Sequence, residues 1–213
     1  MSLKWSAERD ARGIMQVVLE SDALRLSFLP ELGGRLWSLI DLARGEEILW
    51  HHPTLAPHAA VPGAGYDDAF AGGWDELFPS DRAVEIDGTA YPDHGEWWSQ
   101  PWGWRVTEEA GALRLTLSGS GFVTRHTAVR TITLPREGSA FSWQTQITNT
   151  GNDAIPYLWR HHPALPIRPG TRLELPPARV EAVAEDPGAI SAAPFTWPLA
   201  VLDDGSARDL STL

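Results

Sequence analysis

The chain has 213 residues, carries a formal net charge of -11 and contains no cysteine. The lack of thiols excludes disulfides, thiolate nucleophiles and cysteine-ligated metals, and it suits a reducing cytoplasm, where we expect the protein. The negative charge makes nucleic acid and anionic membranes poor partners and favours a neutral small molecule. The first twelve residues are charged and lack an apolar run, so we expect neither a leader nor a membrane anchor.

Apolar and polar residues alternate along several short runs, which Gly and Pro separate. Period-two alternation places one set of side chains on the buried face of a strand. In chain order, the runs predict strands at residues 24–28, 113–117, 141–149 and 173–175. No window shows helical spacing over three turns, so we predict antiparallel sheets packed as a sandwich. No linker or charge block divides the sequence, so we expect one domain spanning residues 1–213.

The region from residue 52 to residue 102 is rich in Gly, Pro, Asp and His and has few alternating runs. Long loops in a compact domain usually carry function, so we expect the binding site here. Eleven tryptophans are present, and most are expected to fill the core. Four of them share a polar stretch broken by Pro and Gly, so core filling is a weaker expectation for them than for the other tryptophans: Trp97, Trp98, Trp102 and Trp104.

Five of the seven histidines lie in three settings: His51-His52, His94 and His161-His162. Imidazole titrates near neutral pH and is the natural acid or base there, although a lone His beside Pro is more often a hydrogen-bonded cap. The second pair is the stronger candidate, because an alternating strand leads into it. Adjacent histidines on a strand point to opposite faces, and no zinc-type spacing is present. We therefore expect no metal and no other cofactor.

Several carboxylates lie in or near the same loop-rich region: Asp67, Asp68, Asp75, Glu76, Asp81, Asp93 and Glu96. Two carboxylates that face each other across a cleft could hydrolyse a glycosidic bond, but spacing alone does not show whether any two do. Glu96 is the strongest candidate, since it stands between His94 and the pair Trp97-Trp98.

The run Asp93-His94-Gly95-Glu96, followed by Trp98 and Pro101-Trp102, resembles the HG segment of the galactose mutarotase-like (aldose 1-epimerase) superfamily. Other stretches resemble that superfamily in the same order, at residues 32–39, 72–79, 130–134, 148–149 and 159–163. The resemblance implies an antiparallel β-supersandwich, covers about residues 24–198, and implies acid–base interconversion of sugar anomers.

By position, the resemblance implies that His162 donates a proton to the sugar ring oxygen, with His161 as the alternative. A carboxylate would take the proton of the anomeric hydroxyl, and His94 would contact sugar hydroxyls beside the acid. The residues expected to bind the sugar are Glu96, Trp98, Trp74, Asp75, His161 and Arg35. All of this depends on His94 and His162 sharing one aromatic hollow.

The superfamily places its general base, a glutamate, in a late strand. After Pro198 this sequence offers only Asp203, Asp204 and Asp209, in a polar tail with no strand pattern. We expect the final strands and that glutamate to be absent, with Glu96 or Asp75 as a substitute base. A shortened sandwich would expose sheet edges, which favours a homodimer.

Three functions remain open from the sequence. The first is an aldose 1-epimerase-like enzyme that acts on a free hexose. The second is a catalytically inactive carbohydrate-binding module with the same fold. The third is a glycoside hydrolase or lyase that uses the loop carboxylates. The resemblance favours the first.

Overall fold

The computed structural model of the protein describes residues 3–181, 190–191 and 193–212. Contacts between residues divide the chain into two compact units, Met1–Leu165 and Pro166–Leu213, and each unit is described by itself. The expectation of one domain stays a prediction. Among the described residues, no helix is both long and apolar enough to span a membrane.

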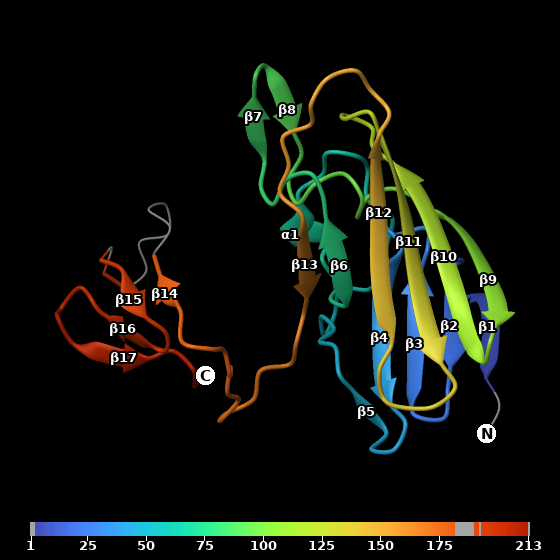
Figure 1. The fold of residues 1–213 in the computed structure, drawn as a ribbon, viewed down its shortest axis with the longest axis horizontal. Coiled ribbons are helices and arrows are strands. Elements are labelled where there is room, and N and C mark those ends of the chain that lie inside the picture. The colour runs from blue at the N-terminus through green and yellow to red at the C-terminus, as the bar shows by residue number, and fades with distance from the viewer. Residues whose placement is uncertain (1–2, 182–189, 192, 213) are drawn as a thin grey trace. The chain divides into compact units, whose positions relative to one another are not determined.

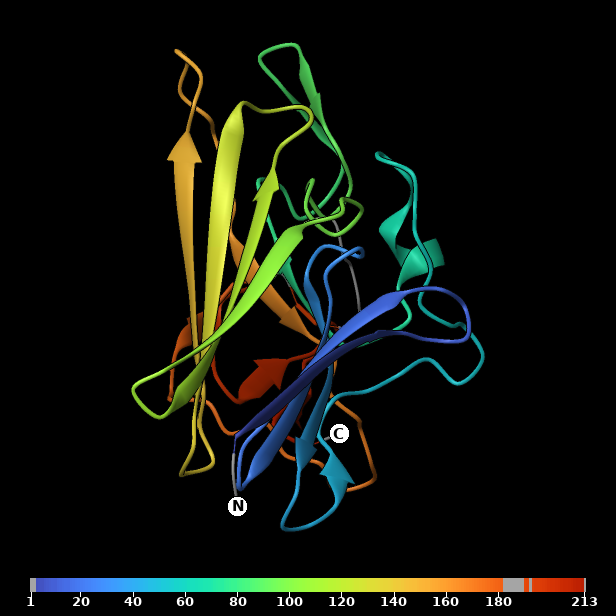
Figure 2. The same cartoon turned by 90° about the vertical axis from the view of Figure 1, so that its right-hand side faces the viewer.

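The first unit consists mainly of two antiparallel sheets, which form two layers (Figure 1). The first sheet runs, in spatial order, through β1 (Lys4–Arg9), β2 (Met15–Glu20), β3 (Leu24–Leu29), β4 (Arg35–Asp41), β6 (Trp74–Leu77) and β13 (Arg160–Pro163), and β5 (Glu46–Glu47) pairs with β4. The second runs through β12 (Ser142–Asn149), β11 (His126–Pro135), β10 (Ala112–Ser120) and β9 (Gly103–Glu109). The strands of the two layers run obliquely past one another (Figure 2). The predicted all-β, antiparallel fold class is confirmed.

The core between the layers follows from the alternation in the sequence. Leu113, Leu115 and Leu117 of β10 are fully buried, whereas Arg114 between them is exposed. These leucines belong to one cluster with apolar residues of the first sheet, such as Phe28. Burying such side chains stabilises the fold by roughly 1.5–3 kcal/mol each. The apolar face of β10 therefore holds the second sheet against the first.

Most of the loop-region tryptophans turn out to be core residues. Trp97, Trp98 and Trp102 are 0%, 4% and 3% exposed, whereas Trp104 is 37% exposed. Trp97 stacks on Phe78 with ring centroids 4.9 Å apart. The weaker expectation of a core role is therefore wrong for three of the four, because Trp97 and Trp102 join the cluster between the layers and Trp98 packs in a second cluster with Tyr66.

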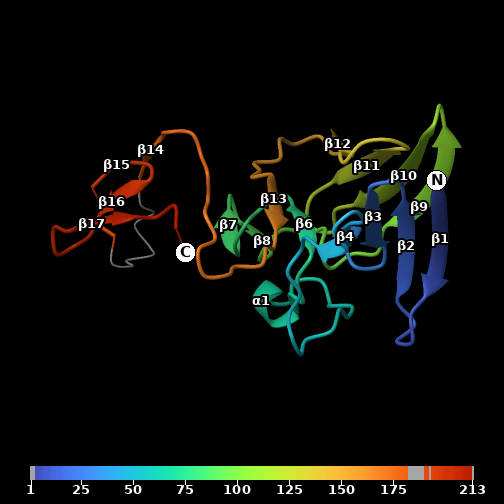
Figure 3. The same cartoon turned by 90° about the horizontal axis from the view of Figure 1, so that it is seen from below.

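Two short elements complete the first unit. The hairpin of β7 (Val84–Ile86) and β8 (Thr89–Tyr91) turns at Asp87 and Gly88, both with positive φ, as a tight two-residue turn requires. The single helical turn α1 (Tyr66–Ala69) lies on the face of the first sheet that points away from β9–β12 (Figure 3). The first sheet therefore has an inner face toward β9–β12 and an outer face toward α1.

The second unit contains a small antiparallel sheet in the order β14 (Arg179–Val180), β15 (Phe195–Thr196), β16 (Leu199–Val201) and β17 (Ala207–Asp209). The expectation of a tail without strands after Pro198 is wrong, since β16 and β17 pair there. The strand expected at 173–175 is also not formed. Leu173 and Leu175 are 45% and 53% exposed, and two prolines follow at 176 and 177, which cannot donate to a ladder.

Candidate functional site

The register of β6 and β13 decides which way the second histidine pair points. In this antiparallel pair, His162 lies opposite Asp75 and His161 lies opposite Glu76. Directly opposed residues share a face of the sheet, and neighbours along a strand alternate between faces. His162 and Asp75 therefore lie on the outer face, and His161 and Glu76 lie on the inner face.

On the outer face, His162 lies beside His94. The two rings have centroids 5.7 Å apart in an edge-to-face arrangement, and each side chain is half-buried. Tyr66 of α1 stacks on the His94 ring at 4.0 Å and meets the His162 ring edge-on at 5.6 Å. Trp98 and Phe70 also contact Tyr66. The structure thus brings His94 and His162 together among aromatic rings, and the hollow for a sugar between them stays a prediction.

A tight turn holds His94 in place. His94 and Gly95 both adopt positive φ, at 55° and 76°, and a Cβ on Gly95 would lie 2.3 Å from the carbonyl oxygen of Phe78. Only glycine fits such a close approach, which explains why Gly follows this His. Asp93 accepts a hydrogen bond from His94 Nδ1 at 2.9 Å, so His94 Nε2 remains for a ligand.

Behind His162 lies a chain of buried polar groups. The Tyr66 hydroxyl lies 3.2 Å from His162 Nδ1 and donates to Asp75 Oδ2 at 2.8 Å. Arg35 binds the same carboxylate through two contacts, both of 2.8 Å. Arg35 and Asp75 are 3% and 2% exposed, so neither side chain is open to a ligand. This differs from the expectation that both bind the sugar.

Burial controls the charge state of these groups. Burial lowers the pKa of His162; the Asp75 carboxylate opposes this effect, and the neighbouring His94 and Arg35 add to it. The ring is therefore neutral near pH 7. Burial, reinforced by the Asp75 carboxylate, also raises the pKa of Tyr66, so its hydroxyl keeps its proton.

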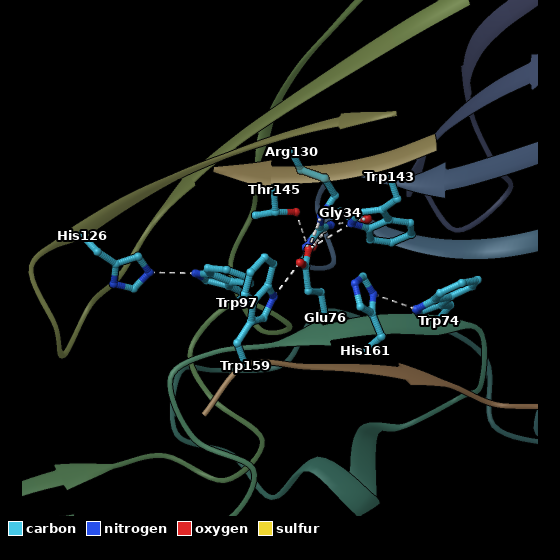
Figure 4. Close-up of polar contacts among 11 residues, drawn as sticks. Gly34, Trp74, Glu76, Trp97, His126, Arg130, Trp143, Thr145, Trp159 and His161 are labelled. Atoms are coloured by element: carbon cyan, nitrogen blue, oxygen red, sulfur yellow. Dashed lines mark hydrogen bonds and ion pairs between the residues drawn. The ribbon is translucent and has the colours of Figure 1, made fainter. Parts of the chain in front are cut away.

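The inner face of β6 carries a second polar cluster, centred on Glu76 (Figure 4). The Glu76 carboxylate accepts hydrogen bonds from Arg130 Nε at 2.7 Å, Thr145 Oγ1 at 2.8 Å, Trp143 Nε1 at 3.1 Å and Trp159 Nε1 at 2.7 Å. Every donor comes from β11, β12 or the segment before β13. The cluster therefore ties the two layers together.

Two residues expected to bind the sugar lie on this inner face instead. Trp74 donates its indole N–H to His161 Nδ1 at 3.2 Å and stacks on Trp143 at 5.4 Å (Figure 4). The sheet separates both side chains from the pair formed by His94 and His162. The structure therefore distinguishes between the adjacent histidines: His162, not His161, belongs with His94.

Glu96 also lies away from the imidazole pair. Its fully buried carboxylate accepts hydrogen bonds from the backbone N–H groups of Phe122, Val123 and Thr124 and from the Thr124 hydroxyl. Those contacts hold the turn that leads into β11. No contact of Glu96 within the described residues reaches His94 or His162, so the structure does not bring this expected binding residue into the site.

A cavity of about 410 Å³ lies elsewhere, beside β12. Its lining is mainly apolar and aromatic, with Phe78, Tyr157 and Trp159 among the residues.

No cluster of three or more potential metal ligands is found in the described part of the chain.

Sequence reasoning missed the residue at the centre of the site. Tyr66 is 1% exposed and contacts His94, His162 and Asp75. Its surroundings offered one indication, since a large aromatic residue directly follows a run of small residues and proline, Pro62-Gly63-Ala64-Gly65.

No protein-family model and no curated protein matches this chain. Solved structures do match in fold. A TPR-domain containing protein from Parabacteroides distasonis superposes with a TM-score of 0.62 at 19% identity, over 78% of this chain and 26% of that one. The chain thus spans about a quarter of that protein's length. The Slr1438 protein from Synechocystis sp. PCC 6803 gives a TM-score of 0.58 at 19% identity, over 100% of this chain and 68% of that one.

A 4-alpha-glucanotransferase from Thermococcus litoralis gives a TM-score of 0.53 at 14% identity, over 85% of this chain and 29% of that one. A galactose 1-epimerase from Lactobacillus acidophilus also matches, over 64% of this chain and 46% of that one, with 15% identity and a TM-score of only 0.38. At 14–19% identity, the first three similarities show a shared fold alone. A TM-score of 0.38 is too low to show even that for the galactose 1-epimerase.

Proposed function

We propose that the chain binds a free hexose at His94 and His162 and interconverts its anomers. The observation that carries this proposal is the 5.7 Å distance between the two imidazole centroids. Two groups this close can reach the ring oxygen and the anomeric hydroxyl of one pyranose, which are attached to the same carbon. The half-buried ring of Phe70, whose centroid lies 5.3 Å from that of His162, supports the proposal, because an aromatic face can contact sugar C–H groups.

The chemistry needs one proton donor and one proton acceptor. His94, as the imidazolium, gives its proton to the ring oxygen while neutral His162 takes the proton of the anomeric hydroxyl, and the bond from the anomeric carbon to the ring oxygen breaks. This assignment reverses the role of acid that the resemblance implies for His162, because burial lowers the pKa of that ring. The aldehyde then rotates, and the reverse transfers close the ring as either anomer and restore both imidazoles. Asp75 and Glu96 do not suit the role of base, since buried donors occupy both carboxylates.

A binding module without catalytic activity is the second candidate. The same occupied carboxylates favour it, because a site without a free carboxylate lacks the base that the resemblance implies. Hydrolysis gains less support, since the two carboxylates beside the pair hold side chains in place: Asp93 binds His94, and Asp75 binds Arg35 and Tyr66.

Polarimetry on freshly dissolved α-glucose and α-galactose tests the proposal. We expect the protein to speed the approach to equilibrium rotation, and His94→Ala or His162→Ala to reduce that effect by about 10²–10⁴-fold. His58→Ala is the matched control, since His58 is exposed and its ring bonds only to the backbone of Ala56 among the described contacts.

Calorimetry with the same sugars separates the candidates. Heat of binding without faster mutarotation would favour the binding module. Neither binding nor acceleration with either sugar would reject both forms of the proposal.

A further inference from the structure

The Tyr66 hydroxyl has two polar neighbours but only one proton. It lies 2.8 Å from Asp75 Oδ2 and 3.2 Å from His162 Nδ1. A phenolic hydroxyl donates one hydrogen bond and accepts others. The direction of the His162 contact therefore depends on which neighbour receives the Tyr66 proton.

The Tyr66 hydroxyl donates its proton to Asp75 rather than to His162. Arg35 binds its carboxylate at both oxygens, at 2.8 Å each, and an arginine keeps its charge inside a protein. The paired carboxylate is ionised and can only accept hydrogen bonds. An N–H of Arg35 and the O–H of Tyr66 thus both point at Asp75, and the Tyr66 oxygen is left as an acceptor.

We propose that Tyr66 is a positioning residue, which holds neutral His162 in the tautomer with its proton on Nδ1 and leaves the lone pair of Nε2 for the ligand. His162 Nδ1–H then donates to the Tyr66 oxygen. A ligand atom that meets Nε2 must carry a hydrogen, as a sugar hydroxyl does, whereas a carboxylate or a fully ionised phosphate oxygen is disfavoured there.

Tyr66 is well held for this task. Its backbone N–H donates to Asp93 Oδ2 at 3.0 Å, and the other oxygen of that carboxylate accepts from His94 Nδ1 at 2.9 Å. The Tyr66 ring also stacks on the His94 ring with an interplanar angle of 8°. Both imidazoles are therefore held from their Nδ1 side around one buried tyrosine, and both present Nε2.

Nitrogen NMR on the intact protein with 15N-labelled histidine tests the tautomer directly, at a pH where the rings are neutral. We expect the Nδ1 signal of His162 to have the shift of a protonated nitrogen and its Nε2 signal that of an unprotonated one. Tyr66→Phe removes the acceptor at nearly constant volume, so His162 should then populate both tautomers. Tyr157→Phe is the control, because Tyr157 is 63% exposed.

Two results would overturn the inference: an unprotonated Nδ1 on His162 in the unchanged protein, or the same tautomer population after Tyr66→Phe. The NMR result does not depend on any activity. The catalytic consequence does rest on the proposed function: if mutarotation is found, Tyr66→Phe should lower its rate by up to about 10-fold, because only part of His162 then keeps an unprotonated Nε2. A protonated Nδ1 in a protein without activity would contradict the proposed function and leave the tautomer assignment intact.

Discussion

His126 is a buried histidine whose hydrogen bonds require the neutral ring. Trp97 donates its indole N–H to His126 Nε2 at 2.8 Å, so that nitrogen must be unprotonated. The other ring nitrogen contacts the Thr124 hydroxyl at 2.7 Å, and that hydroxyl donates to Glu96. Burial lowers the pKa of His126, while the Glu96 charge opposes the shift. At the scale of single residues, this network links the turn before β11 to the core.

The lowered pKa of His126 predicts how stability depends on pH. Below about pH 6.5 the unfolded chain binds a proton at this histidine. The folded chain takes up that proton only at lower pH. The unfolded state therefore binds more protons in this window, and stability falls as the pH falls, by up to about 1.4 kcal/mol per pH unit for one such group.

Urea unfolding at pH 8.0, 6.5 and 5.5 measures this dependence. His126→Gln should be less stable at pH 8.0 and should lose less stability between pH 6.5 and 5.5 than the unchanged chain. Equal losses in the two proteins would contradict the prediction. His162 adds a similar dependence to both proteins, because burial also lowers its pKa, so the comparison isolates His126.

At the scale of elements, the turn at His94-Gly95 joins the site to the end of β6. Gly95 has a φ of 76°, and a Cβ there would meet Phe78 backbone atoms within 2.7 Å. Gly88, in the β7–β8 turn, has nearly the same φ of 75° but has open space around it. The two glycines thus share their backbone conformation and differ in what surrounds them.

We expect Gly95→Ala to destabilise the protein by at least about 2 kcal/mol and Gly88→Ala by about 1 kcal/mol, the cost of a positive φ alone. Thermal and urea unfolding give both values. Gly95→Ala should also shift the His94 NMR signals, since His94 must move with the turn. Equal losses of stability would mean that the neighbouring backbone of Phe78 yields easily, contrary to the prediction.

At the scale of the whole molecule, the first unit contains both apolar core clusters found among the described residues and every residue of the proposed site. We therefore expect residues 1–165, produced alone, to fold and to keep the His94 and His162 NMR signals of the full chain. Circular dichroism and NMR measure this. Loss of the fold on removal of residues 166–213 would instead favour one cooperative domain, as the sequence analysis expected.

The homodimer expected from exposed sheet edges also remains a prediction. Within the described residues, β12 and β13 each end a sheet, and an unpaired edge is a template for another strand.

The sequence alone determined the all-β class, because alternation with period two is a local property that neighbouring residues display. It also singled out His94 and the pair His161-His162, through residue type and the resemblance of their surroundings. It could not choose between His161 and His162, or place Asp75 and Glu76 on opposite faces. That choice depends on the register between β6 and β13, whose paired residues lie more than eighty positions apart in the chain.

Only the tertiary structure decided the roles of Tyr66, Glu96 and the buried tryptophans. A side chain's polarity and neighbours in sequence do not tell which groups meet it in space. Glu96 stands next to His94 in the printed sequence with only Gly95 between them, yet its carboxylate holds the turn before β11. Tyr66 gave little sign in the sequence, yet packing places it against both imidazoles, because α1 lies over the outer face of the first sheet.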